Sequence, residues 1–296
     1  MPVHIPRFVE KAHLRGADAI CLDLEDSVPQ SEKEVARNSV KGAIPTAGKG
    51  GSDVIVRINS RPTDVVVADI QASVWPGLTG ILIPKVESAQ DVLNIDSLVT
   101  RLETERGIAK GSLELGVIVE TARGVVNAYE IATASQRITT IGVGDEDLTL
   151  DLGINPSIDG EELSYVKSNI IIIARAAGIT PLGLAGTLAD FSDLEGLRRS
   201  ALKARKIGFK GASGIHPAQI PIMNEVFSPA DEDVNRAKRV VEAFEKSVSE
   251  GKAAVQLDGK MVDIPVYERA KKTVEWADII QKMERKRKMQ SPPSSA

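Results

Sequence analysis

Residues 115–147 read LGVIVETARGVVNAYEIATASQRITTIGVGDED, and this stretch decides the fold. An apolar run at 115–121 is followed by the helix-like GVVNAYEIATA, and β-prone sequence returns in TTIGVGDED (139–147). A strand, a helix and a second strand in this order predict two parallel strands whose carboxyl ends meet at one edge of a sheet. Both strands end in carboxylates, at Glu120 and at residues 145–147.

The same pattern recurs on both sides of this unit. Further apolar runs that end in polar residues are AICLDLED (19–26), DVIVRIN (53–59), GILIPK (80–85), TPLGLA (180–185) and GASGIHP (211–217). Strands that alternate with helix-like segments at these intervals predict an α/β fold, namely a (β/α)8 TIM barrel. Its first strand would either be very short, in residues 1–3, or be truncated. A doubly wound open sheet is the alternative, but neither GxGxxG nor GxxxxGK[ST] is present.

The pattern changes near residue 229. SPADEDVNRAKRVVEAFEKSVSEG predicts an amphipathic helix, AAVQLDGKMVDIP predicts a short β-ribbon, and VYERAKKTVEWADIIQKMERK predicts another helix. We therefore expect a barrel domain at 1–228, a C-terminal helix-ribbon-helix lid or oligomerisation arm at 229–289, and a flexible tail at 290–296.

Composition excludes several classes of protein. The net charge is −4 with acids and bases interspersed, and aromatic residues make up only 3%, so we expect no nucleic-acid partner. No signal peptide and no apolar run of membrane-spanning length is found, so we expect no membrane partner. The single cysteine, Cys21, fits a reducing compartment, and we expect a cytoplasmic or organelle-matrix protein.

In such barrels, side chains at the carboxyl ends of the strands share one opening, where active sites lie. Here they are Asp23, Glu25, Asp26, Arg57, Asn59, Lys85, Glu120, Asp145, Glu146, Asp147 and His216. Two carboxylates from neighbouring strands are typical of a Mg²⁺ site that waters and substrate oxygens complete, with Mn²⁺ as the alternative ion.

A calcium or zinc site fits the acidic triplet less well. DEDLTLD lacks the glycine of an EF-hand loop, because Leu150 occupies that position, and one cysteine with three scattered histidines gives no zinc ligand set. The triplet could also simply cap a helix that begins at Leu148.

Six ordered motifs resemble a known family: ADAICLDLEDSVP, DVIVRIN, GILIPKVES, GVIVETARGVVNAYEIA, IGVGDEDLTLDLG and GIHPAQI. They are similar to the HpcH/HpaI aldolase/citrate lyase superfamily, and within it to the citrate lyase β-subunit-like branch of citryl-, malyl- and citramalyl-CoA lyases. The resemblance continues through GKMVDIPVYERA. It implies a Mg²⁺-dependent carbon–carbon lyase that cleaves a 3-hydroxyacyl-CoA to acetyl-CoA or propionyl-CoA and a 2-oxo acid, or catalyses the reverse condensation.

The resemblance also implies roles for the acidic strand ends. Glu120 and Asp147 would be the metal ligands. The backbone amides around Gly144, Asp145 and Glu146 would hold the carboxylate of the oxo acid.

Further roles follow from the same resemblance. Arg57 would contact the thioester and oxo-acid oxygens; the alternative is that it simply neutralises Glu25 or Asp26. Asp263 would be the general acid/base, supplied by the arm to a neighbouring subunit in a homotrimer or hexamer. Two carboxylates already suffice as metal ligands. We therefore expect Glu25, Asp26 and Lys85 to contact and position these ligands without binding the metal themselves.

His216 and Pro217 are expected to shape the path of CoA. Three other activities stay open: a malyl-CoA thioesterase, a malate-synthase-like condensation, and a citrate lyase β subunit that acts on a carrier-protein thioester. A CoA-independent aldolase is disfavoured because ICLDLEDSV has no histidine, and a catalytically silent CoA-binding protein because the set of functional residues is intact.

Overall fold

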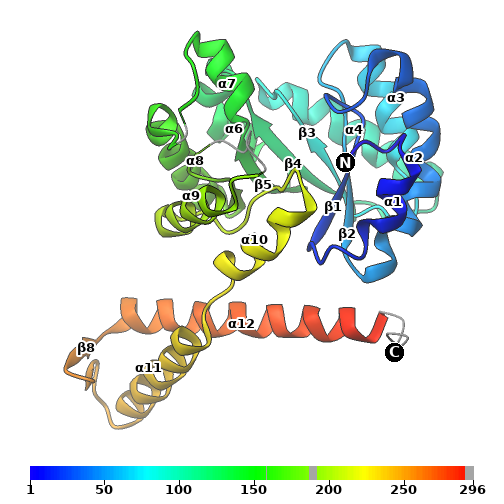
Figure 1. Cartoon of the computed structure of the whole chain (residues 1–296). Coiled ribbons are helices and arrows are strands. Elements are labelled where there is room, and N and C mark those ends of the chain that lie inside the picture. Colours follow the sequence, from blue (N-terminus) through cyan, green and yellow to red (C-terminus); the bar gives the residue numbers. More distant parts are fainter. Residues whose placement is uncertain (158, 187–191, 291–296) are drawn as a thin grey trace. The chain divides into compact units, whose positions relative to one another are not determined.

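Six of the predicted strands form one curled parallel sheet, in which neighbours along the chain are also neighbours in the sheet (Figure 1). The computed structural model describes residues 1–157, 159–186 and 192–290. The strands of the sheet are β1 (Ala19–Asp23), β2 (Asp53–Arg57), β3 (Gly80–Ile83), β4 (Glu114–Val119), β5 (Ile138–Val143) and β6 (Thr180–Leu182).

Helices connect successive strands and pack against one another as an outer layer (Figure 1). This order of strand, helix and parallel strand confirms the α/β class. The helices of this part are α1 (Pro6–Ala12), α2 (Lys33–Ala47), α3 (Thr63–Ser73), α4 (Ala89–Glu105), α5 (Ala122–Val126), α6 (Ala128–Thr133), α7 (Asp145–Leu152), α8 (Ser164–Ala177), α9 (Leu194–Ile207) and α10 (Ile220–Phe227).

The two faces of the sheet are buried to different extents. Alternate residues of the strands, such as Leu22, Val56 and Leu115, are fully buried against the helices. Their neighbours on the concave face, such as Leu82 and Ile118, are only half-buried. Side chains of successive strand residues point to opposite faces, so the outer face makes the core and the inner face is left open to a ligand.

The N-terminal residues lengthen the sheet by a single bridge. Pro2 pairs with Asp23 in parallel orientation, and the Asp23 amide donates to the Met1 carbonyl at 2.8 Å. The very short first strand expected at residues 1–3 is therefore present only as this bridge.

The strand predicted at 211–217 was wrong. This segment starts alongside β6, where the Gly183 amide donates to the Gly211 carbonyl at 2.9 Å. The ladder then stops, because the amides of Ile215 and His216 both donate to the side-chain oxygen of Gln219, at 2.8 and 3.1 Å. Backbone amides that donate to a side chain are not available to pair with a neighbouring strand, so the sheet ends here.

The chain divides into two compact units, Met1–Asn224 and Glu225–Ala296. In the second, α11 (Asp231–Ser249), the antiparallel pair β7 (Val255–Leu257) and β8 (Lys260–Val262), and α12 (Ile264–Gln290) confirm the predicted helix-ribbon-helix. Apart from Gln290, the predicted tail lies outside the described residues.

The second unit has a small apolar core of its own. Phe244 of α11 stacks on Tyr267 of α12 with ring centroids 4.7 Å apart, and Val240 and Val262 are buried beside them. No helix among the described residues combines the length and the apolar character that a membrane crossing needs.

A buried ion pair supports the end of the sheet away from the acidic strand ends. Arg137, just before β5, donates to both carboxylate oxygens of Glu103, at 2.9 and 2.6 Å, and Glu103 is fully buried. Removing the guanidinium would leave a buried charge without its partner, which is strongly destabilising.

We predict that Arg137→Met lowers the free energy of unfolding by roughly 3–5 kcal/mol, the cost of breaking a buried pair. Arg101→Met is the matched control, since Arg101 pairs with Glu105 on the surface and its side chain is 60% exposed. It should cost no more than about 1 kcal/mol. Urea denaturation followed by circular dichroism measures both, and equal losses in the two variants would contradict the prediction.

Candidate functional site

Glu120 is a buried carboxylate at the end of β4. It is 4% exposed, and its Oε2 accepts a 2.7 Å hydrogen bond from the backbone amide of Lys85. Lys85 adopts a left-handed backbone conformation (φ 52°) directly after β3. Burial, followed by the negative charge of Glu25 and then that of Asp147, raises the pKa of Glu120 to about 7. Such a group gains from a nearby cation.

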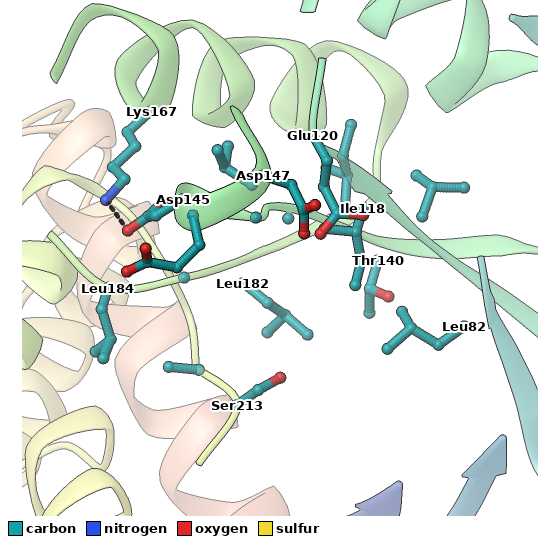
Figure 2. Close-up of a pocket in the computed structure, with 18 of the residues that line it drawn as sticks. Leu82, Ile118, Glu120, Thr140, Asp145, Asp147, Lys167, Leu182, Leu184 and Ser213 are labelled. Atoms are coloured by element: carbon teal, nitrogen blue, oxygen red, sulfur yellow. Dashed lines mark hydrogen bonds and ion pairs between the residues drawn. The ribbon is translucent and has the colours of Figure 1, made fainter. Parts of the chain in front are cut away.

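Asp147 approaches Glu120 from α7, the helix that follows the next strand. Val119 of β4 pairs with Val143 of β5, so that the segments following the two strands leave the sheet side by side. Figure 2 shows the carboxyl groups of Asp147 and Glu120 pointing toward one another. A side chain at Gly144 would overlap the carboxyl group of Glu120, so glycine is required there by close approach.

The acidic triplet forms the first turn of α7, which begins at Asp145, three residues before the expected Leu148. Carboxylates are favourable at this end of a helix because the helix dipole is positive there. Capping of α7 alone does not account for the acidic triplet, however, because its three side chains point in different directions. Asp147 turns to Glu120, Asp145 turns to α8, and Glu146 is exposed.

Lys167 of α8 is the partner of Asp145 and was missed in the sequence. Lys167 is 2% exposed, and its ammonium lies 2.7 Å from Asp145 Oδ2 and 2.9 Å from the carbonyl of Ala185 (Figure 2). The available signal was a lysine at the start of the apolar run SNIIII, where only a paired charge is tolerated.

Lys85 is the cation nearest to the two carboxylates. Its Nζ lies 3.0 Å from Glu25 Oε1, 3.3 Å from Asp147 Oδ1 and 3.7 Å from Asp26 Oδ2. Burial acts to lower the pKa of this ammonium, but the hydrogen bond and charge of Glu25, with Asp26 and Asp147, raise it above its ordinary value. Lys85 is therefore an ion-pair partner and is unsuited to form an imine, which needs a neutral amine.

Arg57 is held by two carboxylates. Its Nε and Nη2 donate to Asp23 at 2.8 and 2.6 Å, and its Nη1 lies 2.9 Å from Glu25 Oε2. Burial alone would raise the pKa of Asp23, but the hydrogen bond and charge of Arg57 and the hydroxyl of Ser27 lower it to about 2. The structural partners of Arg57 are thus Asp23, to which the sequence assigned no role, and Glu25, whereas Asp26 lies next to Lys85.

The guanidinium nevertheless keeps donors for a ligand. It has five N–H groups, and its two hydrogen bonds to Asp23 occupy two of them. Arg57 lines a cavity of about 390 Å³ above the concave face of the sheet, together with Glu120, Gly144 and Asp147. The two predicted metal ligands and the guanidinium of Arg57, a hydrogen-bond donor, therefore line the same cavity.

Three other predicted residues have local contacts. His216 Nδ1 accepts from the Ala218 amide at 3.2 Å, and Pro217 begins the short helix that follows. Asp263 lies in the second unit, where its Oδ1 accepts from the Val266 amide at 3.1 Å. It thus caps the first turn of α12, a structural role that was not predicted from the sequence.

The fit of a metal ion rests on Glu120 and Asp147. Among the described ranges, no group of three or more His, Cys, Asp or Glu side chains is arranged to hold an ion. Two convergent carboxylates suit Mg²⁺, which is commonly held by one or two carboxylates and keeps several waters. The raised pKa of Glu120 is in line with a site that lacks positive charge.

Comparisons with known proteins point to one protein family. The model of the HpcH/HpaI aldolase/citrate lyase family matches residues 1–217. Citrate lyase subunit beta of Leuconostoc mesenteroides subsp. cremoris is 38% identical over 94% of this chain and 91% of its own. The L-malyl-CoA/beta-methylmalyl-CoA lyase of Rhodobacter capsulatus is 34% identical over 93% of this chain and 92% of its own.

A solved structure covers both units. Protein CitE from Mycobacterium tuberculosis, in complex with magnesium, acetoacetate and coenzyme A, has a TM-score of 0.73 and 31% sequence identity. The match covers 94% of this chain and 96% of that one.

We predict a pH-dependent cost of burying Glu120 when no metal is present. Its pKa is raised from 4.5 to about 7, so its contribution to stability is complete below pH 4.5 and is lost as the pH rises through 7. In EDTA, Glu120→Gln should be stabilised relative to the wild type at pH 8 but not at pH 4.5. The gain is at most a few kcal/mol, at about 1.4 kcal/mol for each pH unit between the two pKa values.

Urea denaturation at the two pH values measures this difference. Glu130→Gln is the control, because Glu130 is exposed on α6 and its neutralisation should leave the pH dependence unchanged. A difference between wild type and Glu120→Gln that is the same at both pH values would refute the prediction.

Proposed function

Because the chain belongs to the HpcH/HpaI aldolase/citrate lyase family, we propose that it is a Mg²⁺-dependent lyase that cleaves a 3-hydroxyacyl-CoA thioester of the citramalyl-, malyl- or citryl-CoA type. The products would be acetyl-CoA or propionyl-CoA and a 2-oxo acid, and the reverse condensation would use the same site. The observation that carries the proposal is the buried Glu120 carboxylate facing Asp147 beside Arg57 in one cavity.

In the direction of cleavage, a base removes the proton of the 3-hydroxyl group. The bond between C2 and C3 breaks, its electron pair passes to the thioester as an enolate, and a proton then completes the acyl-CoA product. Glu120 and Asp147 would hold Mg²⁺, which supplies a Lewis acid for the oxygens of the oxo acid. The permanently charged Arg57 would donate its remaining N–H groups to the oxygen on which the enolate charge develops.

Two supports for this chemistry come from residues around the carboxylates. Lys85 fixes Glu120 through its backbone amide and Glu25 through its ammonium, which limits the positions that both carboxylates can take. The amides of Asp145 and Glu146, at the start of α7, would receive the carboxylate of the oxo acid, whereas the expected donor at Gly144 already donates to the Val119 carbonyl at 3.1 Å.

Asp263 is proposed as the general acid/base, brought to the site of a neighbouring copy in a homotrimer or hexamer. The support for this is the presence of the complete arm of α11, the ribbon and α12 after the sheet domain. Closing such an arm over the cavity would exclude water from the enolate. His216 and Pro217, whose short turn follows the cavity residue Ile215, are proposed to border the path of CoA.

We also propose that the sheet is completed as an eight-stranded barrel domain (residues 1–228), followed by the arm (229–289). Residues 1–3 bridge to β1 at one edge, and Lys210 and Gly211 exchange backbone hydrogen bonds with Pro181 and Gly183 at the other. These short pairings stand where the first and last strands of a barrel would lie.

The decisive experiment offers the purified protein citramalyl-, malyl-, methylmalyl- and citryl-CoA, and citryl carrier protein, with Mg²⁺ or with EDTA. We expect Mg²⁺-dependent release of a 2-oxo acid from at least one CoA substrate. Free thiol without oxo acid would indicate a thioesterase or malate-synthase-like enzyme instead. Turnover of the carrier-protein thioester alone would indicate a citrate lyase β subunit, an alternative favoured by the 38% identical relative.

We predict that Glu120→Gln and Asp147→Asn each reduce Mg²⁺-dependent turnover by at least about 100-fold, since outer partners alone already alter affinity or activity 10- to 100-fold. Calorimetric titration with Mn²⁺ should show the loss of binding directly, and Glu130→Gln should behave as wild type. Full Mg²⁺-dependent activity of either variant would exclude the substituted residue as a metal ligand.

For Asp263 the choice of substitution separates catalysis from capping. Asn caps a helix as well as Asp does, so Asp263→Asn should keep the stability of α12 but lose about 10²–10⁴-fold in kcat if the carboxylate moves the proton. Asp263→Ala should lose both activity and about 1 kcal/mol of stability. An unchanged kcat in Asp263→Asn would leave the residue with its structural role only.

A further inference from the structure

The wall of the cavity next to the two carboxylates is apolar. Leu82, Ile118, Leu182 and Phe209 line it, and their side chains carry no group that could balance a charge. Figure 2 shows Leu82, Thr140 and Leu182 on the side of the cavity toward which the carboxyl groups of Glu120 and Asp147 point. A substrate group that lies on this side of the cavity would therefore contact hydrocarbon.

On this side, the cavity is bordered by residues that are paired across three neighbouring strands. Gly116 pairs with Leu82 on one side and with Thr140 on the other. A side-chain carbon at Gly116 would lie 2.7 Å from Thr140 Oγ1 and 3.0 Å from Leu82 Cδ1, so these two side chains already meet over the glycine. The neutral polar side chains in the lining of the cavity are those of Thr140 and Ser213, and both carry hydroxyl groups.

The charge of each cation in the described lining of the cavity is balanced by carboxylates, although Arg57 keeps N–H groups for a ligand. Among the described residues, the lining contains five carboxylates but only two cations, Arg57 and Lys167. Arg57 is paired with Asp23 and Glu25, and Lys167 with Asp145.

We propose that the 2-oxo acid handled by this site carries a single carboxylate, with hydrogen or a small alkyl group on its carbonyl carbon, and that a dicarboxylic 2-oxo acid is rejected. This inference rests on the proposed function and specifies its substrate class. One carboxylate is matched by the metal and by the start of α7. A second would be buried against Leu82 and Leu182 among acidic side chains, without a cation to pair with.

The selection acts through charge, and size contributes little. The cavity of about 390 Å³ has room for a carboxymethyl group, and an apolar wall discriminates only weakly between a hydrogen, a methyl and an ethyl substituent. Glyoxylate, pyruvate and 2-oxobutanoate should therefore all be accepted. The corresponding thioesters are of the malyl and citramalyl type, whereas citryl-CoA, which would release oxaloacetate, should be a poor substrate.

The test titrates the Mg²⁺-loaded wild-type protein with glyoxylate, pyruvate, 2-oxobutanoate and oxaloacetate by calorimetry, and checks oxaloacetate for decarboxylation before and after. We expect oxaloacetate to bind at least about 100-fold more weakly than pyruvate, the effect of one unpaired buried charge. Cleavage rates of citramalyl-CoA and citryl-CoA should differ in the same direction.

A charge placed in the wall supplies the complementary test. Leu182→Arg should narrow the preference for pyruvate over oxaloacetate by at least about 10-fold, while Leu182→Met, the uncharged control, should keep it. Circular dichroism checks that both variants are folded, and the wild-type titration decides the question if Leu182→Arg is not.

Each outcome has one meaning. If oxaloacetate binds the wild type as tightly as pyruvate does, the charge argument is overturned while the proposed lyase function stands. If none of the four acids binds in the presence of Mg²⁺, the proposed function itself fails, and the inference fails with it.

Discussion

The structure depends on how a group of carboxylates is neutralised at one edge of a buried parallel sheet. Asp23, Glu25, Glu120 and Asp147 follow strands or begin a helix at that edge, and three of them are almost fully buried. Like charges at such a distance from water repel one another strongly. Arg57 and Lys85 offset much of this repulsion by pairing with Asp23, Glu25, Asp26 and Asp147. Within the part of the chain that the structure describes, Glu120 forms no ion pair and accepts a hydrogen bond from a backbone amide. The unbalanced charge is thus concentrated on the carboxylate that the family resemblance marks as a metal ligand.

The same arrangement explains the architecture around the site. Gly144 lets the start of α7 approach Glu120 closely, and Lys167 ties Asp145 to α8, so that Asp147 is left facing the cavity. A tightly paired network costs flexibility but keeps the ligands in place, which is what a site needs if its geometry must be ready before the substrate binds. The network at the other end of β5, between Arg137 and Glu103, is buried and serves stability.

Several features followed from local sequence. The strands at β1 to β6 and the helix-ribbon-helix at the C-terminus were predicted because hydrophobic runs, turn residues and helical periodicity are local properties. The strand at 211–217 was predicted wrongly, because the competitor for its backbone donors is a side chain, that of Gln219. Likewise Lys167 could not be assigned to Asp145, since the two are joined only when α7 and α8 pack together.

The sequence by itself determined the class of the fold, the family resemblance and the set of acidic and basic residues at strand ends. These depend on periodicity and on ordered motifs, which the chain carries before it folds. Only the tertiary structure decided which charges meet: that Arg57 pairs with Asp23 as well as Glu25, that Lys85 joins Glu25 to Asp147, and that the wall beside Glu120 is apolar. The reason is physical. The interaction of two charges depends on their separation and on their exposure to water, and both are fixed only when strands distant in the chain take their register.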